Sequence, residues 1–98
     1  MSFVYFLQTD PPLGPIKIGW TSRRAKDRAS KAQTFSATEV AVLAEVPGTK
    51  AMEKRLHDHF WESRIRPRGE LFRRTPELVD LIEFLAEGGM LESFLGPG

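Results

Sequence analysis

The chain has 98 residues, of which 41% are hydrophobic and 28% charged, with a net charge of +1 and no cysteine. This length allows a single domain with one core, and the composition excludes a disordered or fibrous protein. The absence of cysteine excludes disulfides, thiol nucleophiles and ordinary zinc fingers, so any bound metal should be a hard cation. We find no secretory signal and no apolar run near the ~20 residues of a membrane helix, and we therefore expect a soluble cytoplasmic protein.

The charged residues are unevenly distributed along the sequence. Between positions 17 and 31 there are six basic residues and one acid. The basic residues there are Lys17, Arg23, Arg24, Lys26, Arg28 and Lys31, and a second basic stretch consists of Arg64, Arg66, Arg68, Arg73 and Arg74. The acids gather toward the C-terminus. This distribution predicts one positive surface suited to a polyanion such as DNA, but two solvated helix flanks would give the same pattern.

The first half of the chain predicts two strands, a helix and a third strand. Residues 2–8 are an apolar and aromatic run typical of a buried strand, and alternation over 16–20 predicts its antiparallel hairpin partner. The three prolines between them lack the N–H of a strand ladder, which makes that segment a loop. A serine can cap a helix over 22–33 with an alanine inner stripe. The Val- and Ala-rich segment 38–46 predicts a central strand covered on both faces.

The second half of the chain predicts two further helices. Thr49 can cap a helix through Trp61 whose core residues recur every four positions. A loop over 65–69 should lead into a short strand at 70–73. A threonine followed by proline then begins a helix that the glycine pair at 88 and 89 ends.

The predicted element order is β-β-α-β-α-β-α. It indicates an α/β domain with a small mixed or antiparallel central sheet flanked by about three helices. We expect one domain over residues 1–98, with a core of about 3–87 and a C-terminal tail over 88–98.

Tyr5 and Lys17 could meet across the predicted hairpin. A lysine ammonium near a phenol stabilises the phenolate, so the pair could take a proton from water at neutral pH. Taken alone, a core tyrosine and a solvent-facing lysine explain the same residues.

Glu53 and His57 lie four residues apart on a predicted helix and share one face. The carboxylate could hold Mg²⁺ and the imidazole could orient water, although a surface glutamate and a partly buried histidine are the ordinary alternative. His59 falls on another face, and we expect it to be structural or exposed. Arg24 and Arg28 form a second pair at this spacing that could bind phosphate, with solvated arginines as the alternative.

One ordered set of motifs resembles the GIY-YIG nuclease superfamily over residues 3 to 85. It consists of Phe3-Val4-Tyr5, Lys17-Ile18-Gly19-Trp20-Thr21, Arg28, Glu53-x-x-x-His57-x-x-Phe60 and Gly69-Glu70-Leu71-Phe72. The resemblance is to the phage-associated branch whose second triplet reads Lys-Ile-Gly.

This resemblance implies a metal-dependent endonuclease that cuts DNA with water, with Mg²⁺ or Mn²⁺ held by Glu53. Tyr5 would be the general base, Lys17 would favour its base form, and Arg28 would stabilise the pentacoordinate phosphorus. His57 matches a histidine of this branch, and Gly19 allows close backbone approach in the second strand. The basic residues that we expect to contact DNA are Arg23, Arg24, Lys31, Arg66 and Arg68.

The sequence departs from the family pattern in three respects and leaves other functions open. Phe3 begins the first triplet in place of glycine, Leu71 replaces a common tryptophan, and the chain has no asparagine to match the late one of other branches. A non-catalytic DNA-binding module of the same fold is the alternative, and an interaction domain that binds an acidic partner through residues 64–74 is a third. Cutting both strands would need a homodimer or sequential nicks.

Overall fold

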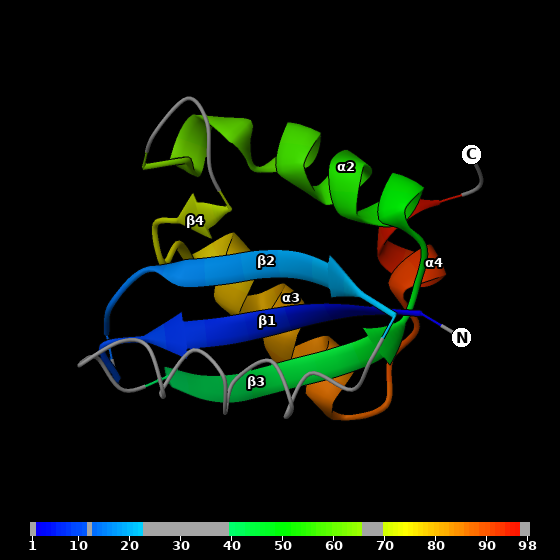
Figure 1. Cartoon of the computed structure of the whole chain (residues 1–98), viewed down its shortest axis with the longest axis horizontal. Helices are drawn as coiled ribbons and strands as arrows, with labels where there is room; N and C mark the ends of the chain where they lie inside the picture. The colour runs from blue at the N-terminus through cyan, green and yellow to red at the C-terminus, as the bar shows by residue number, and fades with distance from the viewer. Residues whose placement is uncertain (1, 12, 23–39, 66–69, 97–98) are drawn as a thin grey trace.

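The computed structural model describes residues 2–11, 13–22, 40–65 and 70–96. Its strands form one sheet in the order β3-β1-β2-β4, and all neighbouring pairs are antiparallel (Figure 1). The strands are β1 (Phe3–Thr9), β2 (Ile16–Thr21), β3 (Val40–Pro47) and β4 (Leu71–Phe72). The α/β class is confirmed, and the sheet is antiparallel. The helix predicted over 22–33 lies outside the described residues.

The β1–β2 hairpin forms where the sequence predicts it. The backbone N–H and the hydroxyl of Thr9 both donate to the carbonyl of Pro15, at 3.0 and 2.7 Å, and close the loop. β1 is buried along almost its whole length, as its apolar run indicates. The register pairs Tyr5 with Gly19 and Leu7 with Lys17, which fixes the side chains that share a face.

β3 lies at an edge of the described sheet, so the prediction of a central strand over 38–46 is wrong. In the described part of the chain it pairs only with β1. Ala44 and Val46 are buried, whereas 38% of Val42 is exposed. A run of small apolar residues suits an edge or a centre equally well, because composition does not identify the pairing partner.

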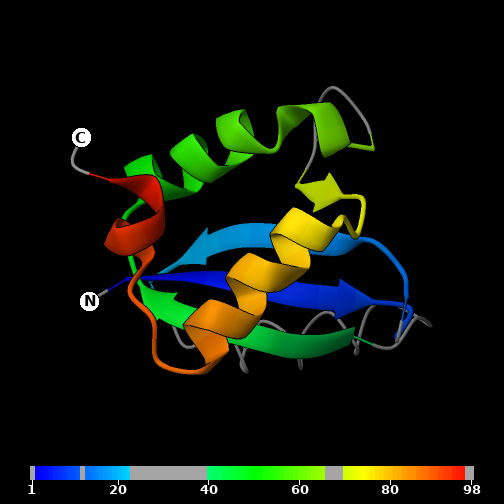
Figure 2. The same cartoon turned by 180° about the vertical axis from the view of Figure 1, so that it is seen from behind.

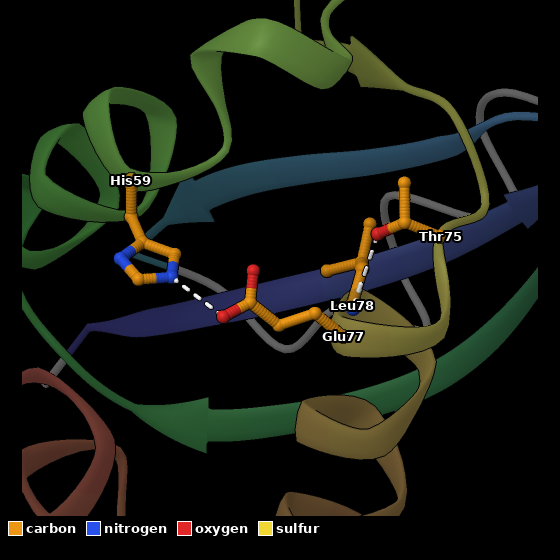
Figure 3. A network of polar contacts seen from close by, with 4 residues as sticks. All are labelled: His59, Thr75, Glu77 and Leu78. Atoms are coloured by element: carbon orange, nitrogen blue, oxygen red, sulfur yellow. Dashed lines mark hydrogen bonds and ion pairs between the residues drawn. The ribbon is translucent and has the colours of Figure 1, made fainter.

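Two helices begin at the predicted threonine caps. These helices are α2 (Lys50–His59) and α3 (Pro76–Ala86). The Thr49 hydroxyl accepts a hydrogen bond from the N–H of Met52 at 3.2 Å, and Thr75 accepts one from Leu78 at 3.3 Å (Figure 3). α2 ends two residues earlier than predicted, and a 3₁₀ turn, η1 (Trp61–Ser63), follows it.

A further helix, α4 (Leu91–Leu95), corrects the predicted tail over 88–98. Leu91 is 1% exposed and belongs to the core. The Arg55 guanidinium of α2 donates to the carbonyl of Leu95 at 2.6 Å, which ties α4 to α2. The core therefore extends beyond residue 87. Five helical residues are too few for a sequence periodicity to identify.

The core lies on one face of the sheet, where α3 crosses the strands (Figure 2). α2 lies beside β2 and β4 and contributes Leu56 and Phe60 to the same core (Figure 1). The His59 ring of α2 reaches Glu77 at the start of α3, with 3.1 Å between its Nε2 and a carboxylate oxygen (Figure 3). His59 is partly exposed in this pair, in agreement with its predicted structural role.

Candidate active site at the outer edge of β2

Among the described residues, the short length of β4 leaves part of the outer edge of β2 without a strand partner. β4 pairs only with Ile16 and Lys17. The next residue, Ile18, donates its N–H to the carbonyl of Glu70 at 2.9 Å, and its own carbonyl oxygen lies 3.0 Å from Nε2 of His57. A histidine of α2 thus takes the place of a strand at this point, which fixes α2 against the sheet.

The bond to Ile18 also sets the tautomer of His57. A carbonyl oxygen can only accept, so Nε2 must carry the hydrogen, and the lone pair of the neutral ring is on Nδ1. The ring contacts Phe72 edge to face, with 5.0 Å between the centroids. Histidines that bind metals or move protons are commonly oriented by such a backbone carbonyl on the opposite nitrogen.

Glu53 lies one helical turn before His57 and shares its face of α2. Burial raises the pKa of the Glu53 carboxyl above its ordinary value, and the charge of Glu70 adds to this effect. His57, Lys50 and Lys17 act in the opposite direction. Groups from β2, from α2 and from the residue before β4 therefore lie within electrostatic range of one carboxylate.

Lys17 reaches this region from β2. Its Nζ lies 3.3 Å from a carboxylate oxygen of Glu70, and both side chains are partly exposed. In the sequence, Glu70 is recognised only as part of the Gly69-Glu70-Leu71-Phe72 motif, which indicates no role for it. The nearby cations Lys50 and Lys54 were not singled out either, because single charged residues on a helix are usually solvated.

Tyr5 lies on the same face of the sheet as Lys17. It stands directly opposite Gly19, two residues after Lys17, and opposite residues of an antiparallel pair project to one face. A Cβ atom on Gly19 would lie 2.9 Å from Cε1 of Tyr5 and closer still to Cζ and the hydroxyl oxygen. The phenol thus lies across β2 at Gly19, with its hydroxyl directed toward the strand edge that α2 occupies. The group that approaches Gly19 closely is this side-chain ring, whereas the sequence predicted a close approach of backbone.

The donor set fits a weakly held divalent cation of the hard type. Mg²⁺ commonly uses one or two carboxylates and completes its coordination with water and substrate oxygens. Glu53 offers such a carboxylate, with Nδ1 of His57 on the same helical face. Within the described ranges, no group of three or more His, Asp or Glu side chains could enclose a metal by itself.

Several predicted site residues lie outside the described residues. These are Arg23, Arg24, Arg28, Lys31, Arg66 and Arg68. The structure brings together Lys17, Glu53 and His57, and it places Tyr5 on the adjoining strand. The positions of the arginines relative to this group remain predictions.

The family model of the T5orf172 domain matches residues 2–85. T5orf172 domains are phage-associated and occur in nuclease-related proteins. No curated protein and no solved structure matches the chain. No helix among the described residues is long and apolar enough to span a membrane.

Proposed function

The chain belongs to the T5orf172 domain family, and we propose that it is a divalent-metal-dependent endonuclease of the GIY-YIG type that hydrolyses phosphodiester bonds in DNA. The observation that carries this proposal is the convergence of Glu53, His57 and Lys17 beside the strand on which the Tyr5 phenol lies. A phenol from β1, a lysine from β2, and a carboxylate and an imidazole from α2 are the groups that a phosphodiester hydrolase needs.

In the proposed reaction Tyr5 is the general base. Its phenolate takes a proton from a water molecule while the water oxygen attacks phosphorus and the ester oxygen on the opposite side leaves. Lys17 assists Tyr5 in this proposal, because it supplies a positive charge on the same face of the sheet. His57, with the Nε2 hydrogen donated to the Ile18 carbonyl, can accept a hydrogen bond at Nδ1 from the attacking water.

The negative charge that develops on the phosphate oxygens needs two further groups. Glu53 would hold Mg²⁺ or Mn²⁺, which supplies positive charge and orients the phosphate. Arg28 would place its guanidinium beside the pentacoordinate phosphorus. The attraction between its positive charge and the negative charge on the phosphate oxygens would strengthen as that charge develops. Cutting both strands would then require a homodimer or two successive nicks.

A non-catalytic DNA-binding module is the second candidate, and two observations favour it. Only 1% of the Tyr5 surface is exposed, which restricts the access of water to the proposed base. Lys17 is already paired with Glu70. In this alternative the same surface holds a phosphate without cutting it.

The deciding experiment is a cleavage assay on supercoiled plasmid and linear duplex in Mg²⁺ or Mn²⁺, with chelator as the blank. We expect cutting that the chelator abolishes and that falls at least ~100-fold in Glu53→Ala and in Arg28→Ala. Glu83→Ala, an exposed glutamate of α3, is the matched control and should cut normally. DNA binding with no cutting in any divalent ion would refute the nuclease and support the binding module.

A further inference from the structure

The outer side of α2 borders an open hollow of about 510 Å³ next to the candidate active site. We call this space the α2 hollow. The ionisable side chains that line it are Lys50, Glu53, Lys54, His57, Asp58 and Arg64. It includes both α2 residues of the candidate site and extends past them along the helix, so a ligand bound at Glu53 would continue into it.

Two lysines follow one row of α2 inside this hollow. Lys50 and Lys54 are four residues apart, both are exposed, and each lies within one turn of Glu53. The Lys50 ammonium lies 5.9 Å from the centroid of the Trp20 ring, which holds it over the end of β2. The row of cations therefore runs beside the Glu53–His57 row and parallel to it.

The placement of Lys50 is unfavourable for the helix itself. It occupies the first position of α2, where the helix dipole disfavours a cation, and it repels Lys54 one turn later. Glu53 offsets part of this cost. An anion bound between the two lysines would reduce their repulsion.

The charges of the hollow favour an anion once Glu53 is neutralised by a metal. Among the residues that line the hollow, Lys50 and Lys54 then lie beside the carboxylate of Asp58. A DNA strand carries one phosphate for each ~3.4 Å of duplex axis, and the ten residues of α2 extend for about 15 Å. A strand with one phosphate at Glu53 would thus place neighbouring phosphates along the hollow.

We infer that the α2 hollow is a second phosphate-binding subsite, in which Lys50 and Lys54 hold DNA backbone phosphates next to the one at Glu53. This inference rests on the proposed function only in that DNA is the ligand, and it applies equally to cutting and to binding alone. The contacts are to phosphate, so they contribute affinity and position without sequence preference.

The test is the salt dependence of DNA binding. A fluorescein-labelled duplex is titrated in chelator, in a Glu53→Gln background that removes the carboxylate charge and prevents metal-dependent cutting. Each phosphate contact contributes about 0.9 to the slope of log affinity against log salt. We expect the double substitution Lys50→Gln and Lys54→Gln to lower the slope by about 2. When the salt concentration rises fourfold, the loss of affinity of the doubly substituted protein should then be roughly 12-fold smaller than the loss of its parent.

Three controls separate a local subsite from a general effect of charge. Arginine at both lysine positions should restore the slope. Asp58→Asn should tighten binding, whereas Glu83→Gln makes the same charge change on α3 and should leave binding unchanged. Thermal melts of every variant should show that the lysine substitutions do not lower stability.

An unchanged slope in the double variant, equal tightening by Asp58→Asn and Glu83→Gln, or no binding of duplex DNA at all would each overturn the inference. A slope change seen with duplex RNA and not with duplex DNA would overturn the ligand assignment. Wild-type cutting with an unchanged slope would leave the nuclease standing and remove the subsite. A lowered slope in the double variant, with no cutting by the wild type, would support the subsite and remove the nuclease.

Discussion

Gly19→Ala offers the sharpest test of how the fold positions the candidate base. The added Cβ would lie 2.9 Å from Cε1 of Tyr5, roughly 0.5 Å short of ordinary van der Waals contact at 3.4 Å, and closer still to Cζ and the hydroxyl oxygen. Tyr5 is 1% exposed and belongs to β1, which lies between β2 and β3, so its ring is confined by its neighbours. The strain must therefore move the ring or the strands.

Forced overpacking of this kind costs about 1–3 kcal/mol of unfolding free energy. In a domain of this size each kcal/mol lowers the melting temperature by roughly 4–8 °C. A hydroxyl displaced by about 1 Å would also lower cleavage by ~100-fold if Tyr5 is the base. Both effects should appear in one variant, measured by thermal denaturation and by plasmid cutting.

Gly89→Ala is the matched control for this substitution. Its Cβ would approach the Phe84 ring to 2.5 Å, but 43% of Phe84 is exposed, so that ring can turn into solvent. We expect a small change in melting temperature and full activity. A Gly19→Ala protein that melts and cuts like the wild type, or a Gly89→Ala protein that loses as much stability, would refute the reasoning.

Three further variants test the electrostatics, the edge of β2 and a helix cap. Burial raises the pKa of Glu53, so the folded protein holds its proton more tightly than the unfolded chain, and wild-type stability should fall as pH rises above 4.5 through the raised value. Glu53→Gln should lack this loss and melt slightly higher at pH 7; an equal or lower melting temperature there would contradict the assignment. His57→Ala leaves the carbonyl of buried Ile18 without its donor and should cost about 1–3 kcal/mol in urea denaturation, against under ~1 kcal/mol for the exposed His59→Ala; similar losses in both would count against it. Thr75→Ala removes the cap of α3 and should cost about 1 kcal/mol, which serine at this position should restore; equal stability of the two variants would disprove the cap's contribution.

Local chemistry explains the parts of the fold that the sequence predicts well. The β1–β2 hairpin follows from an apolar run and a loop with three prolines, which cannot continue a ladder. Thr49 and Thr75 begin helices because a hydroxyl satisfies a free N–H in the first turn. These signals lie within a few residues of the structure that they specify.

The sequence does not correctly predict the elements whose position depends on contacts with residues far away in the chain. The Val- and Ala-rich run of β3 has no feature that distinguishes an edge from a centre. Its edge position follows from its pairing, which in the described part of the chain is with β1 alone. α4 is held by the burial of Leu91 and by the Arg55 contact with Leu95, both of which involve partners far away in the sequence. Short-range patterns do not contain this information.

The candidate site divides in the same way. The residue types and their spacing indicate Tyr5, Lys17, Glu53 and His57 from the sequence alone, through a helical i, i+4 pair and a resemblance of ordered motifs. The tertiary structure decides that the shortness of β4 exposes the Ile18 carbonyl to His57 and that Glu70 pairs with Lys17. It also decides that the Tyr5 phenol lies over Gly19. The first two features depend on sheet order and on the docking of α2, which bring together residues far apart in the sequence, whereas the third depends on the register and side-chain packing of the β1–β2 hairpin.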